Sequence, residues 1–146
     1  MLMRIALVAL VSFRIVGAGH SIPTTLNAGP CPEGEWSSAL LATTTPRRIG
    51  TAYGCGLTDS KHDEAGWGLK WIHQTATETY VLPGGTIRTR ETQRFDFAHD
   101  QHHSHATFTG RVTGGTGRFA GASGTISGAG PAVNGRANYR LTVRLR

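Results

Sequence analysis

Residues 110–130 read GRVTGGTGRFAGASGTISGAG, and eight of these twenty-one residues are glycine. Such a stretch is typical either of a phosphate-binding loop or of a sharp corner between two strands. A P-loop places a lysine on the phosphates, and the chain has no lysine after Lys70. Residues 115–120 match the relaxed dinucleotide-binding pattern G-x-G-x-x-A, which requires a following helix. The glycines that follow exclude that helix, because each costs about 1 kcal/mol in a helix interior.

The glycine stretch therefore predicts a corner between two strands. Residues 108–112 lead into it, and residues 118–127 form the returning strand. Gly121 and Gly124 lie inside this returning segment, where glycine marks a bulge or a tight bend. Bends of this kind are what a small barrel needs in order to close.

A long hairpin is the clearest pattern upstream of the corner. Residues 69–80 (LKWIHQTATETY) and 86–97 (TIRTRETQRFDF) flank a Pro-Gly-Gly turn at 83–85. Alternation along the second segment predicts one shared face: Ile87, Thr89, Glu91, Gln93, Phe95 and Phe97. At the C-terminus Tyr139, Leu141, Val143 and Leu145 alternate with polar or charged residues in the same way. These patterns predict a single all-β domain closed as an antiparallel barrel.

The glycine stretch also resembles a known signature. GGTGRFAGASG is similar to the G-G-T-G-x-[FY]-x-x-A-x-G motif of the barrel shared by allene oxide cyclases and dirigent proteins, especially secreted bacterial members. The resemblance covers roughly residues 50–146 and implies an eight-stranded antiparallel barrel with an internal cavity. Family members include cofactor-free cyclases and isomerases, and proteins that steer radical coupling. The matched motif is structural, so no catalytic residue is transferred from the family.

The N-terminus has the features of an export signal. Residues 1–4 are basic at Arg4, residues 5–13 (IALVALVSF) are apolar, and residues 16–18 fit a small-residue cleavage site. Arg14 fits this pattern poorly, and the apolar run is too short to span a bilayer. We expect a signal peptide over 1–18, an extended arm over 19–46 and the barrel domain over 47–146. The two cysteines, Cys31 and Cys55, are then expected to form one disulfide in a secreted protein.

The charge pattern argues against nucleic acid as a partner. The formal net charge is +6, but the arginines are spread over several segments and alternate with other residues. Nucleic-acid-binding proteins usually cluster basic and aromatic side chains on one face. The arginines are therefore interpreted as a solvated exterior.

Glu91 is the leading candidate for chemistry. It shares the expected inward face with Gln93 and Phe95, and burial in an apolar barrel would raise the pKa of its carboxyl, as a general acid requires. Glu78 and Tyr80 on the preceding segment would join it, whereas Trp71 and His73 have the opposite parity. Pairing of Glu91 with an arginine, or its exposure at a wet barrel mouth, is the alternative. Tyr139 completes the expected ligand-binding set.

A second cluster contains four histidines within seven residues: His99, His102, His103 and His105. Imidazole nitrogens suit Cu²⁺, Ni²⁺ or Zn²⁺. Phe108 and Val112 fix the inward parity of this segment, so His103 and His105 would point outward or lie in a loop. We expect a solvated histidine-rich turn rather than a metal site.

The sequence thus predicts a secreted barrel that holds a small hydrophobic molecule and acts, if catalytic, as a cofactor-free cyclase or isomerase. A non-catalytic carrier or extracellular interaction module is the alternative, and a histidine-based metal binder is a third. No cofactor, nucleic acid or membrane span is expected, and self-association is left open.

Overall fold

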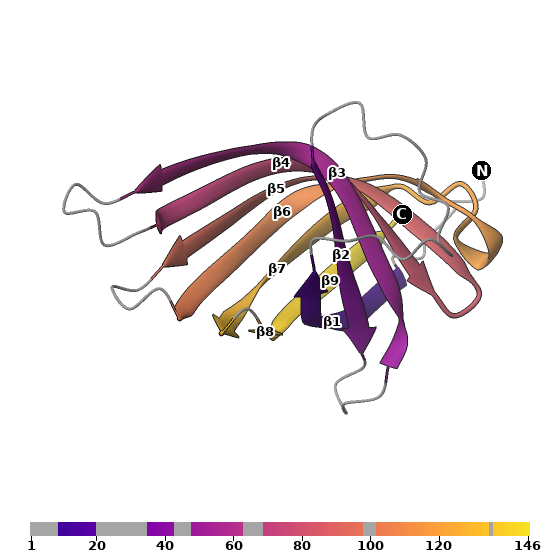
Figure 1. The fold of residues 1–146 in the computed structure, drawn as a ribbon. Helices are drawn as coiled ribbons and strands as arrows, with labels where there is room; N and C mark the ends of the chain where they lie inside the picture. The colour runs from indigo at the N-terminus through magenta and orange to yellow at the C-terminus, as the bar shows by residue number, and fades with distance from the viewer. Residues whose placement is uncertain (1–8, 20–34, 43–47, 63–68, 98–101, 135) are drawn as a thin grey trace, which may run out of the picture.

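The computed structural model describes residues 9–19, 35–42, 48–62, 69–97, 102–134 and 136–146. These residues form antiparallel strands and one short 3-10 helix (Figure 1). The strands are β1 (Ala9–Gly19), β2 (Glu35–Ala42), β3 (Arg48–His62), β4 (Leu69–Leu82), β5 (Gly85–Phe97), β6 (His103–Gly115), β7 (Gly124–Val133), β8 (Arg136–Ala137) and β9 (Tyr139–Leu145). The 3-10 helix, η2, spans Gly117–Phe119.

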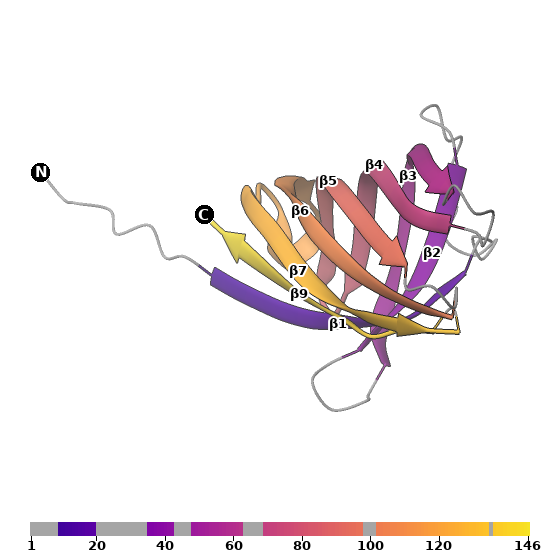
Figure 2. The same ribbon diagram turned by 90° about the vertical axis from the view of Figure 1, so that its left-hand side faces the viewer.

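Strand pairing runs all the way round the molecule. The sheet order is β6-β5-β4-β3-β2-β1-β9-β7-β8, and a further pairing joins β6 to β7. Eight of the strands thus form a closed antiparallel ring (Figure 2). The two-residue β8 pairs antiparallel with the last residues of β7. Closure removes the unpaired edges that an open sheet would expose. The predicted all-β barrel is confirmed.

The β4–β5 hairpin follows the sequence prediction closely. Leu82 pairs with Gly85 across the turn, and Gly84 has φ of 89°, which favours glycine. Along β5, buried and exposed residues alternate from Ile87 to Arg94. The buried positions are those predicted to share one face, because successive side chains of a strand point to opposite sides.

The glycine stretch forms the expected corner, but the segment that follows the corner differs from the prediction. β6 runs to Gly115, but residues 118–123 do not form a strand as predicted; η2 and a turn occupy them, and β7 begins only at Gly124. The backbone N–H of Arg118 donates to the Gly84 carbonyl at 2.8 Å, so the corner packs on the β4–β5 turn. Gly117 has φ of 57°, and a Cβ there would fall on that same carbonyl. Gly117 is therefore required by close backbone packing, whereas Gly121 lies in the turn with φ of 75° and open space around it.

The N-terminal part of the barrel differs from expectation. The domain was predicted to begin at residue 47, yet β1 and β2 lie between β9 and β3 in the ring. β1 alternates as a barrel strand does: Phe13 is 1% exposed in the core, whereas Leu10 is 65% exposed. Arg14, which fitted a signal sequence poorly, lies outward and donates to the Asn138 side chain at 3.0 Å. A short apolar run read as a signal is here a strand with one buried face.

Cleavage near Ala18 would remove β1 from the ring, and cleavage and secretion both stay predictions. Residues 20–34 of the expected arm, including Cys31, lie outside the described residues. Cys55 is buried on β3. The Cys31–Cys55 disulfide therefore stays a prediction. Within the described ranges, no helix is long and apolar enough to cross a membrane.

The hydrophobic core fills the interior of the ring. Inward side chains of every strand from β4 to β7, together with β1 and β9, contribute to it, among them Phe13, Ile87, Ile126, Leu141 and Val143. Phe119 of η2 is buried and belongs to this core at the end where the β4–β5 turn lies. Several buried polar side chains, among them Glu78 and Glu91, lie within these apolar surroundings.

Candidate functional site

Five polar side chains from two neighbouring strands gather inside the barrel. Glu78 and Tyr80 come from β4, and Thr89, Glu91 and Gln93 come from β5. They are 0–6% exposed, and Glu78 and Gln93 are the least enclosed of the five. Burying this many polar groups is costly unless they bond to one another. We call these five residues the interior polar cluster.

Glu91 accepts hydrogen bonds from three partners in the cluster. The Tyr80 hydroxyl donates to Glu91 Oε1 at 2.6 Å, and the Thr89 hydroxyl donates to the same oxygen at 2.5 Å. The Gln93 amide donates to Glu91 Oε2 at 3.2 Å. Donors on both carboxyl oxygens hold the side chain in one orientation and favour its ionised form.

The Gln93 amide also joins the two acidic residues. Its Nε2 donates to Glu78 Oε1 at 3.1 Å as well as to Glu91. Both amide hydrogens are thus used, one on each carboxyl group. The two carboxyl groups therefore form a coupled pair linked through one side chain.

Burial makes the two carboxyl groups weaker acids than usual. The pKa of Glu78 is raised from 4.5 to about 8, first by desolvation and then by the negative charge of Glu91, and partly offset by the Gln93 hydrogen bond. The pKa of Glu91 is also raised by desolvation, but its bonds from Thr89, Tyr80 and Gln93 oppose the rise. Desolvation, followed by the charges of both glutamates, raises the pKa of Tyr80 well above its ordinary value. At neutral pH the Glu78 carboxyl group holds a proton.

Glycines on the neighbouring strands make room for both carboxylic side chains. Gly54 of β3 pairs with Glu78, and a Cβ at Gly54 would fall on the Glu78 carboxylate. Gly110 of β6 pairs with Glu91, and a Cβ there would crowd the Glu91 side chain and the Arg90 carbonyl. A larger residue would displace the Glu78 carboxyl group at Gly54 and would collide with the backbone and stem of Glu91 at Gly110, so both positions belong to the site although they carry no chemistry.

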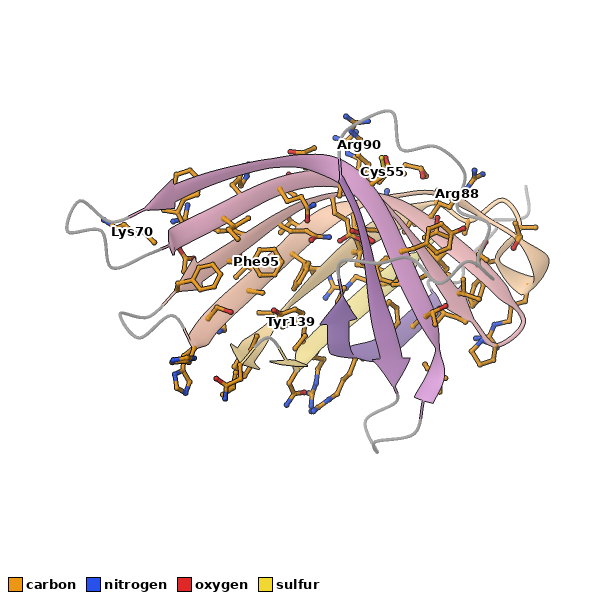
Figure 3. The ribbon with its side chains drawn as sticks, in the orientation of Figure 1. Cys55, Lys70, Arg88, Arg90, Phe95 and Tyr139 are labelled. Atoms are coloured by element: carbon orange, nitrogen blue, oxygen red, sulfur yellow. The ribbon has the colours of Figure 1, made fainter. Side chains whose placement is uncertain are left out.

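Aromatic side chains lie beside the polar cluster. The rings of Phe95, Phe108 and Tyr139 contact one another with centroids 5.1–6.1 Å apart, and the Phe13 and Tyr80 centroids are 5.0 Å apart. Figure 3 shows Phe95 and Tyr139 inside the curve of the sheet, whereas Arg90 lies on its outer side. Phe95 faces inward yet is only partly buried. Solvent therefore reaches the interior from the Phe95 end of β5.

The structure brings most of the predicted site residues together. Glu78, Tyr80, Glu91 and Gln93 share the hydrogen-bond network, and Phe95 and Tyr139 lie in the aromatic group. Within the described ranges, the hydrogen-bond partners of Glu91 are Tyr80, Thr89 and Gln93 rather than an arginine, and its side chain is buried rather than exposed at a barrel mouth. Trp71 lies outside the barrel with Arg94 over its ring, as its parity predicted.

Sequence reasoning left out other residues of the site. Thr89 was placed on the inward face without a role, although the same alternation could have identified it as a partner of Glu91. Phe108 was used only to fix parity. Gly54 and Gly110 carried no signal in the sequence, because their importance depends on the strand register.

The histidine cluster is only partly described, since His99 lies outside the described residues. His102, His103 and His105 are exposed at the start of β6. Across the described part of the chain, no group of three or more histidine, cysteine, aspartate or glutamate side chains is placed to hold a metal ion.

Comparison with known proteins gives a likeness of fold. The sequence matches no family model and no curated protein. Among solved structures, the chain is similar to pyocyanin demethylase, with a TM-score of 0.54 and 16% sequence identity over 94% of this chain and 100% of that chain. At this identity the likeness concerns the fold alone, and it places the chain with proteins of a barrel-type architecture.

Proposed function

We propose that the protein binds a small, largely apolar molecule inside the barrel and moves a proton on it, as a cofactor-independent isomerase or cyclase. The observation that carries this proposal is the pair of buried carboxyl groups, Glu78 and Glu91, bridged by Gln93. Two buried carboxyl groups without a cation between them are unusual as a purely structural feature. Paired carboxyl groups with different proton affinities are typical of acid–base sites.

The two acids have complementary roles in this proposal. Glu91, held by three donors, is the base that removes a proton from carbon next to a carbonyl group. Glu78, which holds a proton at neutral pH because its pKa is about 8, donates to the carbonyl oxygen as the enol forms. Glu91 then returns its proton to a different carbon while Glu78 takes back the proton on the enol oxygen, which completes an isomerisation with both carboxyl groups restored and no electron or group gained or lost. The rings of Phe95 and Tyr139 would contact the apolar part of the ligand.

Two likenesses support the proposal without specifying the substrate. The glycine stretch resembles that of a barrel family with cofactor-free cyclases, and the fold is similar to that of pyocyanin demethylase, an enzyme named for its action on a small molecule. Barrels of this size enclose either packed side chains or one small ligand.

Binding is tested with the neutral fluorophore N-phenyl-1-naphthylamine. We expect its fluorescence to rise with the wild-type protein and the rise to fall in Phe95→Ala, while the exterior variant Thr92→Ala behaves as wild type. Equal enhancement by Phe95→Ala and wild type would place the probe outside the barrel and contradict the proposal.

Proton transfer is tested separately, by deuterium exchange into 2-tetralone in heavy water followed by NMR. We expect wild type to accelerate exchange and Glu91→Gln to lose that acceleration. Asp96→Asn, which removes an exposed carboxylate from the same strand, is the matched control. Probe binding without any exchange would identify the barrel as a carrier instead.

A further inference from the structure

The outer surface of the barrel has a different character from its interior. Strands β5, β6, β7, β9 and β1 are consecutive neighbours in the ring (Figure 2). Among the described residues, the outward positions of these five strands include a single acidic residue, Asp96, which pairs with Arg94 at 2.8 Å. The same positions carry Arg14, Arg88, Arg90, Arg94, Arg111, Arg140 and Arg144. We call this surface the arginine face.

A row of hydroxyl groups crosses the middle of the arginine face. Strand register aligns one outward serine or threonine from each strand, continuing onto β4: Thr75, Thr92, Thr109, Ser127, Thr142 and Ser12. Neighbouring members of this hydroxyl row are about 4.8 Å apart, which is the strand spacing of a sheet. Residues from separate parts of the sequence thus form one continuous line of donors and acceptors.

Arginines flank the hydroxyl row on both sides. Towards the β4–β5 turn, Arg90 pairs with Arg111, and Thr125 separates Arg111 from Arg144. On the other side, Arg14 pairs directly with Arg140. Like charges placed opposite each other on adjacent strands are destabilising. Binding of an anion between Arg14 and Arg140 would offset this cost.

The residue types on this face restrict the kind of anion. No phenylalanine, tyrosine or tryptophan occupies a described outward position on the five strands. The outward histidines, His103 and His105, lie at the start of β6, so the middle of the face offers bases of a single-stranded nucleic acid few rings to stack on. Leu10 and Val133 are the exposed large apolar residues in the described part of the chain, and two are too few to anchor a membrane surface. Arginine guanidinium groups beside a line of hydroxyls suit carboxylate or sulfate groups on a hydroxyl-rich polymer.

We propose that the arginine face binds an acidic polysaccharide laid along the hydroxyl row. Its hydroxyl groups would exchange hydrogen bonds with the serine and threonine side chains. Its carboxylate or sulfate groups would bind the arginines on either side of the hydroxyl row. Arginines on opposite sides of the row are four residues apart on one strand, which is a distance of about 13 Å. This inference is independent of any ligand inside the barrel.

The test measures binding of a fluorescently labelled heparin oligosaccharide by anisotropy at two salt concentrations. The face variant Arg111→Thr/Arg144→Thr, which removes two arginines of the arginine face, is compared with the control variant Lys70→Thr/Arg118→Thr. The control removes the same charge from exposed positions outside the arginine face. We expect the face variant to bind the oligosaccharide about tenfold more weakly, with a salt dependence reduced by about two counterions, and the control variant to bind within about twofold of wild type.

A second variant tests the hydroxyl row without any change in charge. Thr109→Val/Ser127→Ala is expected to weaken oligosaccharide binding several-fold while its circular dichroism and thermal unfolding match wild type. Equal losses in both arginine variants would overturn the proposal, since binding would then reflect net charge alone. Tighter binding of duplex DNA, or of phosphatidylserine vesicles, than of the oligosaccharide at the same salt would also overturn it.

Discussion

Replacing Glu78 by glutamine should change how the stability of the barrel depends on pH. Below pH about 4.5 this carboxyl group is protonated in both the folded and the unfolded chain, so it causes no difference there. Between about 4.5 and about 8 the unfolded chain loses the proton while the folded protein keeps it. The folded state then binds more protons, so the free energy of unfolding falls as pH rises and the loss is complete above pH about 8.

The size of this effect follows from the raised pKa. A rise from 4.5 to about 8 corresponds to about 5 kcal/mol between the two protonation states. Because the charge of Glu91 contributes to the rise, this free energy belongs to the coupled pair of carboxyl groups and is an order of magnitude. Glu78→Gln keeps an oxygen that accepts from Gln93 but cannot ionise, so it should remove most of the slope and leave the smaller part due to Glu91.

The assay is urea unfolding at a series of pH values from about 5 to about 9, followed by circular dichroism. We expect wild type to lose several kcal/mol over this range and Glu78→Gln to be the more stable protein at the alkaline end. Asp96→Asn is the control, because Arg94 lowers the pKa of this exposed carboxyl instead. Parallel curves for wild type and Glu78→Gln would refute the assignment of a retained proton to Glu78.

Other single substitutions test the remaining parts of the structure. Tyr80→Phe removes a donor to buried Glu91 and should cost about 1.5–3 kcal/mol in chemical unfolding; no loss would mean that the bond is absent. Gly54→Ala places a methyl group on a carboxylate and should abolish interior probe binding, which an unchanged binding curve would contradict. Phe13→Ala should cost about 3–5 kcal/mol if β1 belongs to the folded protein, whereas a wild-type unfolding curve would show that it does not. Arg140→Thr removes the like charge opposite Arg14 and should stabilise the barrel by a few tenths of a kcal/mol, measured as a raised midpoint.

Local sequence patterns predicted the strands that have one face in the hydrophobic core and the other in water. β5 and β9 alternate strictly, because their inward side chains lie in the core and their outward ones in water. This is why Glu91, Gln93 and Phe95 could be assigned to the interior from sequence. The strand β1 was not predicted, since an apolar run with a basic flank has the same composition as an export signal, and the export signal itself stays a prediction. Only its pairing with β2 and β9 identifies it as a strand.

The amino-acid sequence by itself determined the all-β class, the β4–β5 hairpin, the glycine corner and the face of β5 that carries the acids. These depend on turn residues and a two-residue period, which act between near neighbours in the chain. The tertiary structure alone decided that Gly54 and Gly110 accommodate two carboxyl groups, that Gln93 bridges them, and that arginines from distant segments flank one row of hydroxyls. Strand register sets each of these arrangements, and register is a property of the closed ring rather than of any one segment.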